Sequence, residues 1–180
     1  MRHFGYACIN MGFSSRPKSK RITTNRSMIR RTFDERGIKY ASELALQNIQ
    51  DLHTILQWNL ENDIYFYRLS SNIFPWASEY DMDYEQILEA CQKVGNFAQQ
   101  HNMRLTSHPG PFNKLASPKE RVFNIAKTDL TVHADVFDMI GLPRTPYAKL
   151  NIHVGAAYGD KPFALDNFCR NFERLPESVR

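Results

Sequence analysis

The sequence of 180 residues lacks the features that mark several classes of protein. It has three cysteines, an odd number at wide spacing, so no disulfide is expected and the thiols are predicted to be reduced. Its apolar runs are only a handful of residues long, and none follows the first residues, so neither a membrane span nor a secretory signal is predicted. We therefore expect an intracellular protein, cytoplasmic or nuclear, that is not secreted and does not bind a membrane.

Acidic side chains are missing from the first part of the chain. Residues 1–33 carry eight Lys or Arg and no Asp or Glu, whereas residues 34–180 carry fifteen basic and nineteen acidic side chains. The basic positions are mixed with Ser, Thr and Asn, which is typical of a loop that contacts a polyanion such as nucleic acid. A solvated basic loop or a transit peptide would have the same composition. The basic residues concerned are Arg16, Lys18, Lys20, Arg21, Arg26, Arg30 and Arg31.

Three glycine-containing motifs are also missing. The sequence has no GxxxxGK[ST] or GxGxxG phosphate loop and no GxSxG elbow. Nucleotide hydrolysis, dinucleotide redox chemistry and serine esterase chemistry therefore lose support. With 42% hydrophobic and 23% charged residues, the chain is typical of a globular domain. No internal boundary is visible, so we predict a single domain spanning residues 1–180.

Short runs of β-favouring residues alternate with helical periodicity along the chain. The runs predict strands at 4–10, 64–71, 103–108 and 148–154, and the periodicity predicts helices at 42–59, 83–102, 117–142 and 163–178. Strands that alternate with helices of this length favour parallel pairing with right-handed crossovers, hence an α/β fold. An eight-unit barrel usually needs about 250 residues. We therefore expect a TIM-barrel-type β-α repeat of about four units, an incomplete barrel.

Polar side chains stand at the carboxyl end of each predicted strand, where barrels of this class bind ligands. They are Asn10 on the first strand, Arg68, Ser70 and Ser71 on the second, His108 on the third and His153 on the fourth. Two imidazoles at the ends of adjacent strands could share one metal ion, although each could instead be satisfied by loop backbone. Hydrolytic metal sites usually include an Asp or Glu ligand, but no carboxylate stands at the end of a predicted strand. A further histidine, His133, is predicted to be a surface or interface residue of the third helix.

Several separate motifs, in a fixed order, resemble the UV-damage endonuclease family, whose members are metal-dependent DNA repair enzymes with an α/β barrel. The motifs are GYACIN at 5–10, RITT at 21–24, YRLSSNIFPWAS at 67–78, RLTSHPG at 104–110, ASP at 116–118, IHVG at 152–155 and GDK at 159–161. The resemblance implies an enzyme that nicks damaged double-stranded DNA 5′ to UV lesions by metal-assisted phosphodiester hydrolysis. It thus adds an activity to the fold class that the alternation of strands and helices predicts.

The same resemblance implies roles for individual residues. His108 and His153 would be ligands of a divalent ion, with manganese favoured and magnesium or zinc as alternatives. Tyr6 and Asn10 would face the damaged strand, and the loop after HPG would push side chains into the duplex. Here Pro111-Phe112 replaces the Gln-Tyr usual in the family; Phe can still stack between bases, but it cannot make the hydrogen bonds of the amide.

Length separates this chain from the family. Its members continue into further Asp, His and Glu ligands beyond the position of Arg180, so no catalytic residue is assigned in this chain, which corresponds to the N-terminal half of the barrel. Either the chain is a truncation, or a second chain or a second copy completes the barrel. Two alternatives stay open: a catalytically inactive, truncated DNA-binding fragment, and another barrel such as a sugar isomerase, which would not need the basic loop.

Overall fold

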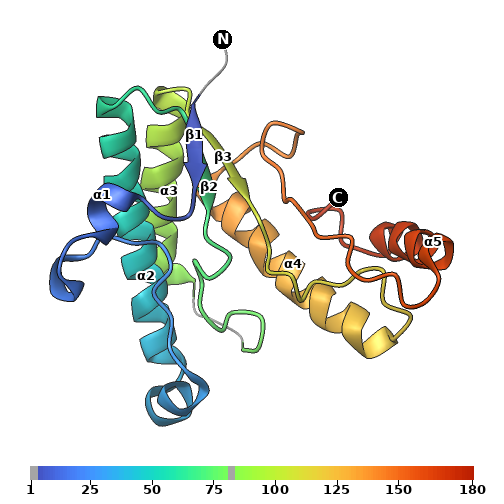
Figure 1. Cartoon of the computed structure of the whole chain (residues 1–180). Coiled ribbons are helices and arrows are strands. Elements are labelled where there is room, and N and C mark those ends of the chain that lie inside the picture. The colour runs from blue at the N-terminus through green and yellow to red at the C-terminus, as the bar shows by residue number, and fades with distance from the viewer. Residues whose placement is uncertain (1–3, 81–83) are drawn as a thin grey trace.

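The computed structural model describes residues 4–80 and 84–180, and strands alternate with helices along them (Figure 1). The strands lie side by side at the centre, and α1 and α5 lie on opposite sides of the molecule. In chain order the elements are β1 (Gly5–Ala7), α1 (Met11–Ser14), a short 3-10 helix (Lys18–Lys20), α2 (Arg30–Glu61), β2 (Phe66–Leu69), α3 (Glu85–Gln100), β3 (Arg104–Ser107), α4 (Glu120–Ile140) and α5 (Lys161–Glu173).

The strands form one parallel sheet in the order β1-β2-β3. Tyr6 is in register with Tyr67, and Tyr67 with Leu105. All three strands lie within the ranges predicted from the sequence. The prediction of an α/β fold with parallel pairing is confirmed.

The fourth predicted strand, 148–154, is wrong as a strand. It makes a single parallel bridge, in which the amide of Ser107 donates to the carbonyl of Lys149 (3.0 Å) and that of Asn151 donates to the carbonyl of Ser107 (2.9 Å). The next bond of a parallel ladder would need an N–H from Pro109, which has none. The sheet therefore has three strands and one bridge, in place of the four β-α units expected.

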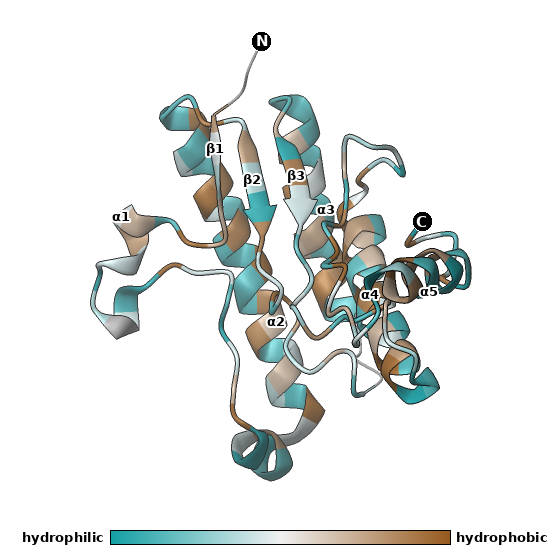
Figure 2. Cartoon of the chain, turned by 45° about the vertical axis from the view of Figure 1, so that its right-hand side comes forward, coloured by the Kyte–Doolittle hydropathy of each residue, from teal (hydrophilic) through white to brown (hydrophobic). Residues whose placement is uncertain are grey.

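The core lies between one face of the sheet and the long helices. Tyr67, Leu69 and Leu105 point to this face and are at most 1% exposed. The apolar stripe predicted for α3 is confirmed, because Ile87, Cys91, Val94 and Ala98 are all buried. Figure 2 shows apolar and polar segments alternating along α2, as expected of a helix with one buried side.

Helix α3 approaches α4 closely at one glycine. A Cβ built on Gly95 would lie 1.6 Å from the carbonyl oxygen of Ile140, so a larger residue would push the two helices apart. A second, smaller core joins α4 to α5 and the segment before α4. Its buried members are Leu115, Phe123, Ala126, Leu130 and Leu175. Among the described residues, no helix is long and apolar enough to cross a membrane.

Helix α2 begins well before the predicted residue 42. Its first turns are charged, and the pairs Arg30–Asp34 (3.0 Å) and Arg31–Glu35 (3.5 Å) support them at i,i+4 spacing. The helix kinks at Gly37, whose φ of 68° favours glycine. The apolar periodicity used for the prediction does not detect this polar stretch. The i,i+4 spacing of its charged residues would have indicated a helix.

Candidate metal centre and DNA-binding surface

The carboxyl ends of β1, β2 and β3 lie at one edge of the sheet, called the rim here (Figure 1). Parallel strands bring their carboxyl ends together, and α/β proteins bind ligands there. Three loops leave the rim: residues 8–10 before α1, residues 70–80 and residues 108–119. The site residues predicted at the ends of the first three strands therefore lie at the same edge.

His108 and His153 meet at the rim. Their Nε2 atoms lie 2.6 Å apart and their ring centroids 4.4 Å apart, with the rings tilted by 40°. One ring must donate its proton to the lone pair of the other, because a hydrogen bond needs one donor and one acceptor. Burial lowers the pKa of His108, and the neighbouring His153 and Arg68 lower it further. The His108 imidazole is therefore neutral near pH 7, the form that binds metal ions.

The imidazole pair fits part of a metal site. Two Nε2 atoms that face one another can turn their lone pairs to a shared divalent ion. Within residues 4–80 and 84–180, however, no group of three His, Cys, Asp or Glu side chains is close enough to hold an ion. The described chain thus offers two ligands, and manganese binding by them stays a prediction.

The loop that follows β3, residues 108–113, is called the HPG loop here. It presents Phe112, which is 81% exposed, next to the exposed Pro111. Asn113 closes the loop and is buried; its Nδ2 donates to the carbonyl of Gly110 (3.1 Å) and to Oδ2 of Asp129 (2.7 Å). A large apolar ring on a fixed turn is suited to stacking on bases, as predicted for Phe112.

The end of β2 supplies one cation to the same region. Arg68 is half-buried, and its Nε has no hydrogen-bond partner within the described residues. Its positive charge lowers the pKa of His108, which places it near the imidazole pair. Ser70 is buried and accepts a hydrogen bond from the amide of Asn72 (3.3 Å), while Ser71 is exposed. Of the three residues predicted here, Arg68 and Ser71 are at least partly exposed, whereas Ser70 is buried.

The end of β1 is a chain of buried polar groups. The hydroxyl of Tyr6 donates to Oδ1 of Asn59 (2.6 Å) and accepts from Nδ2 of Asn10 (2.8 Å). Oδ1 of Asn10 accepts from the amide of Phe13 (3.3 Å) and so caps α1. Asn10 is 4% exposed, and burial raises the pKa of Tyr6. Their predicted contact with DNA is untested, and in the free chain both side chains hold the loop between β1 and α1.

Comparisons with known proteins give the family. The sequence profile of the family described as UV-endonuclease UvdE matches residues 2–180. The chain belongs to this family. It is 34% identical to the UV-damage endonuclease of Schizosaccharomyces pombe, over 98% of this chain and 30% of that protein. It is 33% identical to the UV DNA damage endonuclease of Bacillus anthracis strain A0248, over 98% of this chain and 56% of that protein.

A solved structure agrees with this assignment. The crystal structure of SacUVDE matches with a TM-score of 0.87 and 26% sequence identity, over 99% of this chain and 58% of that chain. The chain therefore spans about a third to just over a half of the length of these relatives. The family resemblance read from the sequence motifs is confirmed.

The basic segment, residues 16–31, is paired with carboxylates at the three arginines predicted to bind DNA. Arg26 lies 2.6 Å from Asp51 and also donates to the carbonyls of Thr23 and Arg21. Arg30 and Arg31 sit on the first turn of α2 and make the i,i+4 pairs described above, and Arg30 also reaches Glu79 (2.9 Å). DNA contact by them stays a prediction, but Arg26 has a structural role as well.

Two buried polar residues were not predicted, or were predicted elsewhere, from the sequence. Asn48 on α2 accepts from the amide of Arg26 (2.9 Å) and donates to the carbonyl of Ile73 (3.0 Å), so it ties the basic segment to the loop after β2. His133 was predicted to be a helix-surface or interface residue, and the surface placement is wrong: it is 4% exposed, and its Nδ1 lies 3.2 Å from Oγ of Ser107. A lone polar residue in an apolar stripe was the available signal for both.

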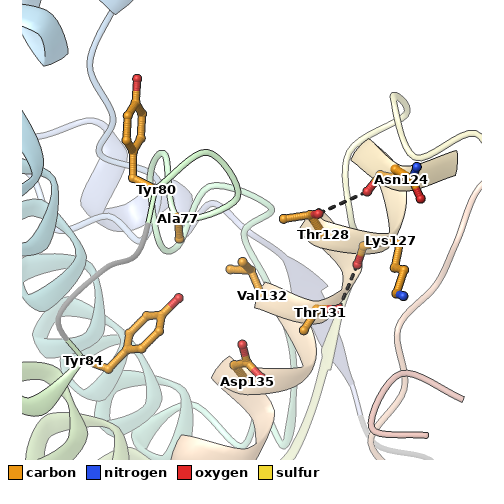
Figure 3. Close-up of a pocket in the computed structure, with 9 residues that line it drawn as sticks. All are labelled: Ala77, Tyr80, Tyr84, Asn124, Lys127, Thr128, Thr131, Val132 and Asp135. Atoms are coloured by element: carbon orange, nitrogen blue, oxygen red, sulfur yellow. Dashed lines mark hydrogen bonds between the residues drawn. The ribbon is translucent and has the colours of Figure 1, made fainter. Parts of the chain in front are cut away.

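A cavity of about 540 Å³ opens between the loop after β2 and α4 (Figure 3). Tyr80 and Tyr84 line one side, and polar residues of α4 line the other. The hydroxyls of Thr128 and Thr131 donate to carbonyls of their own helix, so they are already engaged. The carboxylate there is Asp135, whose pKa is raised by burial and by Asp138. The imidazole pair and Phe112 do not line this cavity, so we place the candidate site at the rim.

Proposed function

We propose that this chain is part of a DNA repair endonuclease that nicks damaged DNA 5′ to a UV lesion by metal-assisted hydrolysis. The observation that carries the proposal is the convergence of His108 and His153 at the rim, next to the loop that presents Phe112. Family membership and the names of the relatives, which are UV-damage endonucleases, support the DNA substrate. A sugar isomerase would need neither an exposed stacking ring nor a basic segment.

The residues have distinct roles in this proposal. His108 and His153 would hold a divalent ion, manganese in first place, with magnesium or zinc as alternatives. Such an ion, when bound, polarises the phosphodiester and lowers the pKa of water. Arg68 places a positive charge beside His108, where it attracts a phosphate and adds to the effect of burial and His153 in lowering the pKa of that imidazole. Phe112 enters the duplex beside the lesion, and Pro111 restricts the conformation of its turn. Contacts to the damaged DNA strand come from Tyr6, Asn10, Ser70 and Ser71.

One observation favours a second function. The described residues bring together two imidazoles without a third metal ligand, and two ligands hold an ion weakly. A DNA-binding fragment that cleaves nothing would have this arrangement. A second chain or a second copy that adds carboxylates beside the imidazole pair would restore the endonuclease. Both the fragment and the completed endonuclease would bind the lesion, but only the endonuclease would cleave the DNA.

A plasmid assay tests the proposal. Supercoiled plasmid, either UV-irradiated or untreated, is incubated with the chain and manganese chloride, and the nicked circular form is quantified. We expect nicking of the irradiated plasmid and at least tenfold less nicking of the untreated one. Equal nicking of both plasmids would refute lesion recognition, and binding of irradiated DNA without any nicking would favour the inactive fragment.

A further inference from the structure

Helix α4 carries a chain of polar side chains that reaches both ends of the HPG loop. Oγ of Ser107, the residue before the loop, lies 3.2 Å from Nδ1 of His133. Nε2 of His133 lies 3.8 Å from Oδ2 of Asp129, one helical turn away. Oδ2 of Asp129 accepts a hydrogen bond of 2.7 Å from Nδ2 of Asn113, the last residue of the loop. These four residues are called the α4 bracket here.

The bracket is consistent with one direction of hydrogen bonding. Burial lowers the pKa of His133, so its ring is neutral and carries one N–H. The carboxylate of Asp129 faces Nε2, which assigns the proton to Nε2 and leaves Nδ1 to accept from the hydroxyl of Ser107. Asn113 then donates to Asp129 from the other side. Asp129 thus accepts a hydrogen bond from Asn113, and the N–H of His133 faces the same carboxylate at 3.8 Å, which is longer than a hydrogen bond.

The bracket is buried at its centre and holds the two ends of the HPG loop. Ser107, His133 and Asn113 are 1%, 4% and 4% exposed. Between them, Phe112 and Pro111 are exposed, and nothing lies within 4 Å of a Cβ built on Gly110. Burying polar groups costs free energy unless they are fully paired, and it brings directional constraint that apolar packing lacks. Within the loop Pro109 is buried and the carbonyl of Gly110 accepts from Asn113, and the bracket adds support at the two ends.

We propose that Asp129 and His133 are positioning residues for DNA recognition: they hold the HPG loop so that Phe112 is presented to the damaged duplex. The inference rests on the proposed function, since it assumes that Phe112 contacts DNA. Neither residue touches the DNA itself. Asp129 acts through Asn113, and His133 acts through Ser107, which also precedes His108.

The test compares three variants of the full chain. Asp129→Ala removes the acceptor for Asn113, and Asp129→Asn keeps one acceptor oxygen. Asp138→Ala is the matched control, because it removes a carboxylate from the same helix that pairs with Arg144 on the surface (2.6 Å). Alanine favours helix at both positions, so α4 is expected to remain folded. Hydrogen exchange is followed by mass spectrometry in residues 108–114 and, as an internal reference, in β2.

Loop exchange gives the first result, independent of DNA. We expect Asp129→Ala to speed exchange in residues 108–114 at least tenfold, Asp129→Asn to restore most of the protection, and Asp138→Ala to match the unaltered chain. Exchange in β2 should not change. Unchanged loop exchange in Asp129→Ala would overturn the positioning role.

Selective binding gives the second result. The ratio of affinities for damaged and intact duplex should fall in Asp129→Ala to the level of Phe112→Ala, and the double variant should fall no further. A full ratio in Asp129→Ala despite faster loop exchange would also overturn the proposal. If the unaltered chain shows no preference for damaged duplex, the proposed function fails instead, and the exchange result still decides whether the bracket holds the loop.

Discussion

The Nε2 atoms of His108 and His153 lie 2.6 Å apart, although 45 positions separate these residues in the sequence. The single bridge between Ser107 and Leu150 explains how this comes about. The bridge holds the segment after α4 beside β3. His108 follows Ser107 by one residue and His153 follows Leu150 by three, so the two imidazoles meet at the rim.

The first prediction concerns this pair. Replacing both histidines by alanine should abolish manganese binding or weaken it at least tenfold, because the two rings are the ligands that the described residues bring together. Calorimetric titration with manganese chloride measures it. His101→Ala, at the end of α3, is the control and should bind like the unaltered chain. Equal heats in the double variant would refute the site.

The second prediction concerns Phe112, whose exposure means that truncation removes little packing. Phe112→Ala should leave the melting temperature within about 1 °C and weaken binding to damaged duplex about 5- to 150-fold, since base stacking is worth ~1–3 kcal/mol per base. Phe4→Ala is a matched control, because Phe4 is 84% exposed and precedes β1 at the opposite edge of the sheet. Equal weakening for damaged and intact duplex would speak against lesion recognition by Phe112.

The third prediction separates the arginines. Arg31, whose side chain is 81% exposed, should act by charge alone. If its guanidinium neutralises one phosphate, Arg31→Ala should reduce the slope of log K against log salt by about 0.9. The ratio of affinities for damaged and intact duplex should not change, because phosphate contacts carry no base identity. Arg26→Ala should also lower the melting temperature, since Arg26 pairs with the half-buried Asp51. An unaltered salt slope in Arg31→Ala would exclude this contact.

Sequence reasoning found the parts of the fold that local pattern encodes. The apolar stripe of α3 and the three short strands follow from periodicity. The fourth strand is absent because Pro109 has no N–H to continue the ladder. This can be recognised only when the segment around Leu150 is known to pair with the end of β3. Similarly, Asn48 and His133 were not recognised as buried loop anchors, because the residues they bind, Ile73 and Ser107, are more than twenty positions away.

The candidate site, too, was predictable from the sequence only in part. Strand-end positions and family motifs pointed to His108, His153 and Phe112, and the structure brings the two imidazoles together at the rim, while the roles of all three stay predictions. They did not reveal that Asn10 caps α1 or that Arg26 pairs with Asp51, because both contacts depend on how separate segments pack.

The fourth prediction concerns pH. The pKa of His133 lies below its ordinary value of 6.5 because the ring is buried. The unfolded chain therefore takes up the proton first as pH falls, so folding stability contributed by the neutral ring is present above pH 6.5 and decreases below it. Melting temperatures from pH 8 to 5 should fall more steeply for the unaltered chain than for His133→Gln. Parallel curves for the two proteins would contradict a buried neutral His133.

The fifth measurement tests the central claim, that the imidazole pair supports cleavage 5′ to a lesion. A duplex with one pyrimidine dimer and an end label is incubated with the chain and manganese chloride, and the product is sized on a sequencing gel. We expect one product, cut 5′ to the dimer, that disappears when His108 and His153 are both replaced by alanine or when the metal is chelated. Cleavage at the same position by the double alanine variant, or cleavage of undamaged duplex to the same extent, would contradict it.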